Sequence, residues 1–148
     1  MATGTLTSAT TSSLTQHIIN GVAGGIVGGI VFGIMMQVQG MLPMVASMVG
    51  SQDVVVGWIV HLLISAFIGA VFGVVMSRLP ANWGVTIGAG IGNGVIWWIL
   101  GALILMPLIL GMNAMVLQIG EMQINSLIGH LIFGVIAAVV YRIMASRA

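Results

Sequence analysis

Four long apolar stretches, almost free of charge, constrain the fold of this chain more than any other feature. They cover residues 18–42, 54–77, 84–106 and 126–144. At about 1.5 Å of helical rise per residue, each is long enough to cross the ~30 Å hydrocarbon core of a bilayer. Only 3% of the 148 residues are charged, too few to cover the surface of a water-soluble domain. The sequence therefore predicts an all-α integral membrane protein with four transmembrane helices.

The few charged residues predict how these helices are oriented. Arg78 follows the second stretch, Arg142 and Arg147 close the fourth, and Asp53 and Glu121 fall in the two opposite loops. With an even number of spans, the arginines and both termini share one side, which the positive-inside rule makes cytoplasmic. We predict a multi-pass protein of the bacterial inner (plasma) membrane with N-in, C-in topology.

The chain also contains an internal duplication. An offset of 64 residues aligns Pro43 with Pro107. The same offset places Gly24 on Gly88, Gly28 on Gly92 and Met48 on Met112. After extra residues in the second loop the offset becomes 69 and places His61 on His130. We predict two parallel two-helix repeats, residues 17–79 and 80–148, related by a pseudo-twofold axis along the membrane normal. They form one four-helix domain, which follows a mobile cytoplasmic tail, residues 1–16.

Glycines at every fourth position indicate how the helices pack. Glycine at this spacing removes the side chains from one helix face and lets a neighbouring backbone approach closely. We expect such faces to hold the bundle together and to join it to further copies or to a membrane complex. The glycines predicted to pack between helices are Gly24, Gly28, Gly69, Gly88, Gly92 and Gly134.

The segments between the helices carry their own signals. Pro43 and Pro107 are expected to end the first and third helices, because proline lacks the N–H that continues the hydrogen-bond ladder. The loops that follow are apolar, so we expect them to lie at the outer interface or to fold back against the bundle. Asp53, and either Asn125 or Ser126, are the predicted N-caps of the second and fourth helices.

His61 and His130 lie on matching rows of small residues, and the pseudo-twofold would bring their imidazoles toward each other. Three interpretations are open. Each ring can hydrogen-bond to a neighbouring helix. The pair can ligate a b-type haem or a metal ion, with Met48 and Met112 as soft ligands, although closely packed helices leave little room for a macrocycle. The pair can also serve proton-linked transport, although no Asp or Glu within the spans extends a proton relay.

Several kinds of chemistry are excluded by composition. The chain has no cysteine, which removes disulfides, thiolate chemistry and iron–sulfur clusters. No carboxylate lies within the spans to orient Ser65 and His61 as a catalytic triad, or to form a pair for acid–base catalysis. A net charge of +1 gives no reason to expect nucleic acid as a partner. We therefore predict a protein that is not an enzyme, with the lipid bilayer as its surroundings.

Three segments resemble the YagU-like bacterial inner-membrane proteins: GWIVHLLISAFIGAVFG, MPLILGM and NSLIGHLIFGVIAAVVY. The resemblance covers about residues 20–145 and carries over His61, Pro107, Gly129 and His130. It implies a small multi-pass inner-membrane protein, and the family has no established activity. The sequence thus favours a glycine-packed homo-oligomer or complex subunit, with haem or metal binding, or proton-responsive transport, as the alternative.

Overall fold

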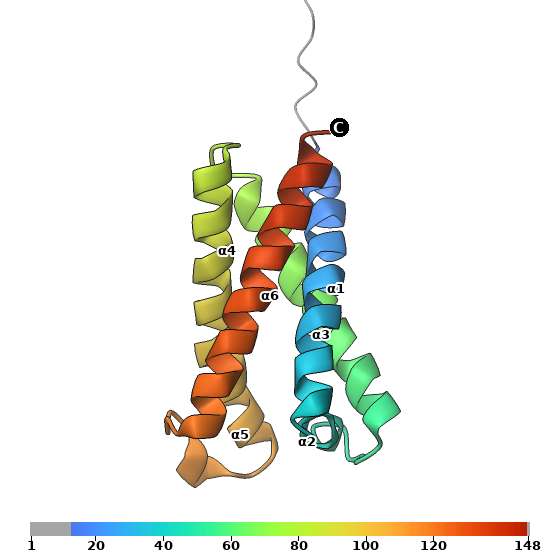
Figure 1. The fold of residues 1–148 in the computed structure, drawn as a ribbon, viewed down its shortest axis with the longest axis vertical. Helices are drawn as coiled ribbons and strands as arrows, with labels where there is room; N and C mark the ends of the chain where they lie inside the picture. Colours follow the sequence, from blue (N-terminus) through green and yellow to red (C-terminus); the bar gives the residue numbers. More distant parts are fainter. Residues whose placement is uncertain (1–12, 148) are drawn as a thin grey trace, which may run out of the picture.

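The computed structural model describes residues 13–147, and every regular element within them is a helix (Figure 1). The long helices are α1 (Leu14–Val38), α3 (Val54–Met76), α4 (Trp83–Trp97) and α6 (Glu121–Ala145). The shorter elements are α2 (Leu42–Ser47), the π-helix η1 (Trp98–Leu105), α5 (Met106–Ile109) and the 3₁₀ turn η2 (Asn113–Met115). Counting α4, η1 and α5 as one span, four helices are long and apolar enough to cross a membrane, as predicted.

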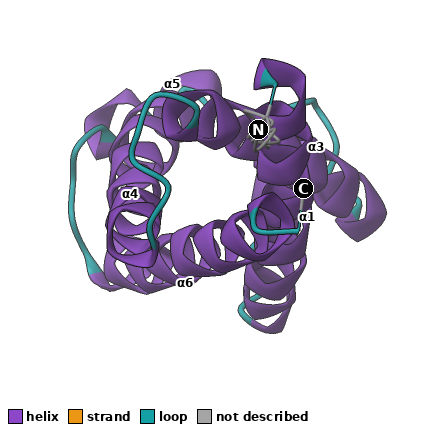
Figure 2. Ribbon diagram, turned by 90° about the horizontal axis from the view of Figure 1, so that it is seen from above, coloured by secondary structure: helices purple, strands orange, loops and turns teal. Residues whose placement is uncertain are grey.

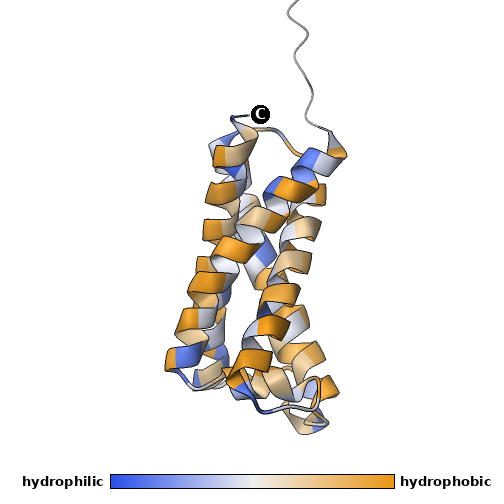
Figure 3. Ribbon diagram, turned by 90° about the vertical axis from the view of Figure 1, so that its right-hand side faces the viewer, coloured by the Kyte–Doolittle hydropathy of each residue, from blue (hydrophilic) through white to orange (hydrophobic). Residues whose placement is uncertain are grey.

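The two ends of the bundle differ in charge. The start of α1, the α3–α4 turn and the end of α6 lie at one end, which carries all three arginines and which we call the arginine end (Figure 1). Asp53 and Glu121 begin α3 and α6 at the opposite end, beside α2 and α5. Hydrophilic residues concentrate at these two ends (Figure 3). The protein is therefore a small multi-pass membrane protein whose arginines share one side.

Helix starts differ from the prediction at two places. The Ser13 hydroxyl accepts a hydrogen bond from the Gln16 N–H at 3.2 Å, so α1 begins at Leu14 and not after residue 16. The rest of the predicted tail, residues 1–12, lies outside the described residues. The predicted cap of α6 at Asn125 or Ser126 is wrong, because the helix already begins at Glu121. The cap of α3 is confirmed: the Asp53 carboxylate accepts from two backbone N–H groups, the nearer at 2.7 Å.

Pro43 begins a short helix and does not end a long one. α1 ends at Val38, and Gly40 turns the chain with a φ of +67°, a value that favours glycine. Pro43 then occupies the first turn of α2, where its missing N–H costs no hydrogen bond. α2 packs on α3: its Leu42 side chain is buried, and a Cβ added at Gly57 would lie 2.4 Å from the Leu42 carbonyl oxygen. The predicted fold-back of this loop is confirmed.

Pro107 lies inside the third span, which continues through η1 and α5 to Ile109. The prediction that this proline ends the helix is therefore wrong. Because Pro107 has no N–H, the Leu103 carbonyl four residues earlier lacks its usual α-helical donor. The Leu117 N–H, from the loop after α5, donates to the Leu103 oxygen at 2.9 Å. This second loop also returns to the bundle, although most of its residues are exposed.

Two faces of α1 are made of glycine. A Cβ at Gly21 or Gly25 would lie within 2.3 Å of an α3 carbonyl oxygen, and one at Gly24 would lie 2.4 Å from the Ala137 oxygen of α6. Gly28 packs in the same way against Phe133 of α6. α1 therefore packs closely on α3 with one face and on α6 with the other.

α4 packs on α6 through glycines other than those predicted. Gly90 and Gly94 approach the carbonyl oxygens of Gly134 and His130, where an added Cβ would lie 2.4 Å from either oxygen. Among the glycines predicted to pack between helices, Gly24, Gly28, Gly69 and Gly134 each face a backbone or ring too close for a Cβ. Gly88 and Gly92 have no atom of the described residues within 4 Å of an added Cβ.

The bundle is close-packed along three helix pairs and open along the fourth. Close contacts follow the order α3, α1, α6, α4, whereas α3 and α4 barely touch, so the helices form an incomplete ring (Figure 2). A regular twofold axis between the predicted repeats would make the α3–α4 contact match the α1–α6 contact. The packing glycines Gly25 and Gly90 are offset by 65 residues, and this offset places Asn93 where α1 has Gly28. The matching face of α4 therefore carries an asparagine at a position where α1 carries a glycine.

Candidate functional site

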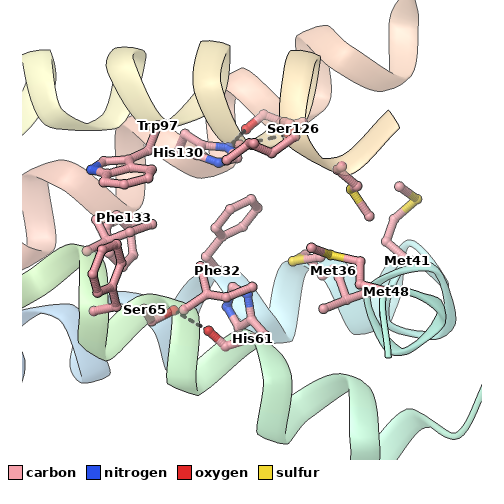
Figure 4. A pocket seen from close by; sticks show the side chains of 18 of the residues that line it. Phe32, Met36, Met41, Met48, His61, Ser65, Trp97, Ser126, His130 and Phe133 are labelled. Atoms are coloured by element: carbon pink, nitrogen blue, oxygen red, sulfur yellow. Dashed lines mark hydrogen bonds between the residues drawn. The ribbon is translucent and has the colours of Figure 1, made fainter. Parts of the chain in front are cut away.

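A cavity of about 300 Å³ lies beside the open α3–α4 seam, on the half of the bundle away from the arginine end. Its walls come from α1, α2, α3, the third span and α6 (Figure 4). Its lining includes Phe32, Met36, Met41, Met48, His61, Ser65, Trp97, Met106 and His130. Across the seam itself, the rings of Phe67 and Trp97 meet edge to face with centroids 5.8 Å apart. The cavity is therefore built by the four helices together.

His61 is fixed on one wall by a hydrogen bond between helices. Its ring lies on α3, is buried, and its Nε2 donates to the Gly29 carbonyl oxygen of α1 at 2.9 Å. This bond needs α1 to approach closely, and glycine at position 29 permits it, since a Cβ there would lie 2.5 Å from the Ser65 Oγ. The Ser65 hydroxyl in turn donates to the His61 carbonyl oxygen at 2.8 Å. The predicted interhelical hydrogen bond is therefore present for His61.

His130 is fixed on the opposite wall within its own helix. Its Nδ1 donates to the Ser126 carbonyl oxygen, one turn earlier on α6, at 2.8 Å. A carbonyl oxygen only accepts, so in a neutral ring the bonded nitrogen carries the proton and the other nitrogen keeps a lone pair. The acceptors left over are Nδ1 of His61 and Nε2 of His130. Both histidines thus leave a nitrogen able to bind a cation or a hydrogen-bond donor.

Phe32 lies between the two histidines (Figure 4). Its ring centroid is 5.5 Å from that of His61 and 4.9 Å from that of His130, with both rings edge-on. The two imidazoles share no hydrogen bond with each other. A haem held between them would need the two nitrogens roughly 4 Å apart across the iron, given Fe–N bonds like the ~2 Å bonds of imidazole to metals. The Phe32 ring occupies that space, so the geometry does not fit bis-histidine haem ligation.

Methionine side chains gather at the end of the cavity next to α2. Met36, Met41 and Met48 lie together there (Figure 4). Met106 lines the cavity from the third span. The structure thus brings Met48 into the same cavity lining as the histidines. It does not bring Met112, which is 41% exposed and lies outside the cavity lining. Within residues 13–147 no cluster of three or more His, Cys, Asp or Glu side chains could hold a metal ion.

Sequence reasoning missed most of the lining residues, among them Phe32, Met36, Met41 and Met106. Phe32 and Met36 are one turn apart on α1, a spacing that places both on one helix face. That spacing is the only sequence signal for them, and it is shared by ordinary core residues. Met41 and Met106 carry no signal of this kind, because a turn and a π-helix set their directions.

No family model matches the sequence, and it has no significant match among curated proteins or solved structures.

Proposed function

We propose that this small multi-pass membrane protein binds a soft monovalent metal cation, of the copper(I) class, in the cavity between its histidines and methionines. One observation carries the proposal: four methionines and two histidines line one cavity that has no carboxylate or thiol in its lining. Thioether and imidazole ligands select Cu(I) over hard cations such as Mg²⁺ or Ca²⁺, which require oxygen ligands.

The hydrogen bonds of the histidines support this proposal. Histidines that ligate metals commonly donate their other ring N–H to a backbone carbonyl, which fixes the tautomer and the ring orientation. His61 and His130 both have such a bond, to Gly29 and Ser126 respectively.

The charge of the site supports a monovalent ion. All the available ligands are neutral, and burying an uncompensated charge in an apolar site is costly. That cost rises steeply with charge, so a monovalent ion suits this cavity better than a divalent one. Soft ligands stabilise such an ion without adding negative charge.

A matched pair of variants tests the proposal. Purified protein in detergent is titrated anaerobically with Cu(I) in competition with bathocuproine disulfonate. We expect one tightly bound Cu(I) per wild-type chain and a loss of affinity of about tenfold or more in Met48→Leu and in His61→Gln. Met112→Leu, which removes the same sulfur from outside the cavity, should bind as the wild type does.

Two results would refute metal binding. One is a wild-type chain that does not compete with the chelator, and the other is an equal affinity of Met48→Leu and Met112→Leu. Protein that binds no Cu(I) but retains a small apolar molecule through purification would assign the cavity to an apolar ligand. An absorption band of haem in the purified protein would likewise overturn the proposal.

We propose, as a second candidate, that copies of this chain associate through α4. The row Gly84, Gly88 and Gly92 has no atom of another helix within 4 Å of an added Cβ, and the third span is the least buried of the four. Small residues on an uncovered helix face permit close approach of a second helix. Gly88→Leu should shift a dimer to monomer by light scattering in detergent, whereas Ile96→Leu on the same helix should not. A monomeric wild type would refute it.

We also propose that this chain is related to the YagU-like inner-membrane proteins. It rests on the three sequence segments around His61, Pro107 and His130. The same applies to the cytoplasmic position of the arginine end, which rests on the positive-inside rule.

A further inference from the structure

A second cavity, of about 290 Å³, lies at the arginine end. It is bordered by α1, the end of α3, the α3–α4 turn, the start of α4 and the last turn of α6. Its polar lining residues are His17, Ser77, Thr86, Tyr141 and Arg142. It shares no lining residue with the cavity of His61 and His130, so it is independent of the proposed cation site.

Within residues 13–147, Arg142 is the only charged residue that lines this cavity. Its Nε is shielded from solvent and has no hydrogen-bond partner within residues 13–147. The two acidic residues of the chain do not compensate it, because Asp53 and Glu121 begin their helices at the opposite end. From Glu121 to Arg142 the α6 helix rises about 30 Å at ~1.5 Å per residue. A shielded N–H without an acceptor is costly, and an anion in the cavity would supply the missing acceptor.

The other polar side chains of the lining are held in place beside Arg142 by hydrogen bonds and ring packing. His17 Nδ1 and the Tyr141 hydroxyl are hydrogen-bonded, and their rings stack with centroids 6.0 Å apart. Phe72 packs edge-on against Tyr141 at 5.5 Å, which holds the ring in place. The Thr86 hydroxyl already donates to the Asn82 carbonyl oxygen at 2.8 Å. The lining therefore contains a cation and hydrogen-bonding groups, and no carboxylate.

We propose that this cavity binds a phosphate group through the guanidinium of Arg142, with His17 and Tyr141 forming its adjacent wall. The guanidinium presents its N–H groups as a planar fork that matches two phosphate oxygens, and such charge-assisted pairs are among the strongest hydrogen bonds in proteins. The cavity lies at the end of membrane-spanning helices, the level at which lipid headgroups meet a protein. Basic pockets between such helices bind anionic headgroups. The phosphate can belong to a phospholipid or to a soluble phosphate compound.

Three probes distinguish these sources on the wild-type protein in dodecyl maltoside. They are inorganic phosphate, dioctanoyl phosphatidic acid and dioctanoylglycerol, which has the same chains without the phosphate. Binding is measured as a concentration-dependent rise in the melting temperature, because a ligand of the folded state stabilises it. If only phosphatidic acid raises the melting temperature, the cavity binds a lipid headgroup. If inorganic phosphate raises it as well, the cavity binds a soluble phosphate compound. An equal response to dioctanoylglycerol, or no response to either phosphate probe, would overturn the proposal.

Arginine variants test the role of Arg142. Arg142→Gln should weaken binding of the active probe by about tenfold or more, as expected for loss of a charged hydrogen-bonding pair. Arg147→Gln removes an exposed charge from the same helix end and should leave affinity within about twofold, by the same scale. Equal losses in the two variants would refute a specific site and leave only general charge attraction.

Two further measurements keep the proposal testable if Arg142→Gln does not fold. Arg142→Lys retains the positive charge but lacks the planar guanidinium that matches two phosphate oxygens, so it should bind the active probe more weakly than the wild type. On the wild type itself, chloride at matched ionic strength should raise the melting temperature less than the active phosphate probe. Equal effects of chloride and phosphate would overturn the assignment.

Discussion

Alanine substitutions at Gly90 and Gly92 test the packing of α4 on α6 with two almost identical changes. A Cβ at Gly90 would lie 2.4 Å from the Gly134 carbonyl oxygen and 2.6 Å from the Ala138 Cβ, whereas a Cβ at Gly92 would have no atom within 4 Å. Ordinary contact begins near 3.4 Å, so Gly90→Ala forces the two helices about 1 Å apart. The two substitutions lie two positions apart on one helix, and they differ in whether the new methyl group is crowded by α6.

The expected magnitude follows from two terms. Overpacking at a close contact costs about 1–3 kcal/mol, and a gap of up to ~1 Å forfeits a quarter to a half of the dispersion energy of each contact along the seam. The gain in helix propensity from glycine to alanine, at most about 1 kcal/mol, is common to both variants and cancels between them. We therefore expect Gly90→Ala to be less stable than Gly92→Ala by about 1–3 kcal/mol. Gly92→Ala should be as stable as the wild type or slightly more stable.

The free energy of unfolding can be measured by titrating SDS into dodecyl maltoside micelles and following tryptophan fluorescence, since the chain has four tryptophans. Circular dichroism on the same samples reports whether the helices persist. Equal unfolding midpoints of Gly90→Ala and Gly92→Ala would show that the α4–α6 seam is not close-packed. A destabilised Gly92→Ala would show instead that the Gly84–Gly88–Gly92 face is covered, by a second copy or by another helix.

Two further predictions concern topology and the cavity. A reporter inserted near Gln52 should report the outside, and one fused to the C-terminus should report the cytoplasm, because the arginines share one side; the reverse pattern would refute this orientation. Phe32→Ala should lower the free energy of unfolding by about 3–5 kcal/mol, because a buried ring that contacts both histidines leaves a void. Unchanged stability in the SDS titration would mean that Phe32 does not hold the two walls in place.

The two histidines make different hydrogen bonds although they occupy matching places on their helices. The offset of 69 residues gives His61 and His130 matching places on their helices. His61 nevertheless bonds to α1, whereas His130 bonds to its own helix. A close approach of α1 supplies the acceptor for His61. On the other side, α4 meets α6 at the His130 backbone through Gly94, and the imidazole bonds to the Ser126 carbonyl oxygen of its own helix.

The sequence by itself determined the number of spans, the charge difference between the two ends and the cap at Asp53. Each of these depends on local features: a run of apolar residues, the place of five charges, and one carboxylate beside free N–H groups. It also indicated that glycine faces and both histidines matter to the packing and the cavity. These properties need no knowledge of which helix neighbours which.

The tertiary structure decided which glycines pack and where the cavity lies. Gly88 and Gly90 are equally small, and only the rotation of α4 against α6 makes Gly90 the contact and leaves Gly88 open. The open α3–α4 seam is likewise a property of the packing, in which these two helices barely touch. Met48 and Met112 match in sequence, yet the fold of α2 brings only Met48 to the cavity. The rotation of each helix and the path of each loop depend on many close contacts added together. A periodic sequence pattern does not determine that sum.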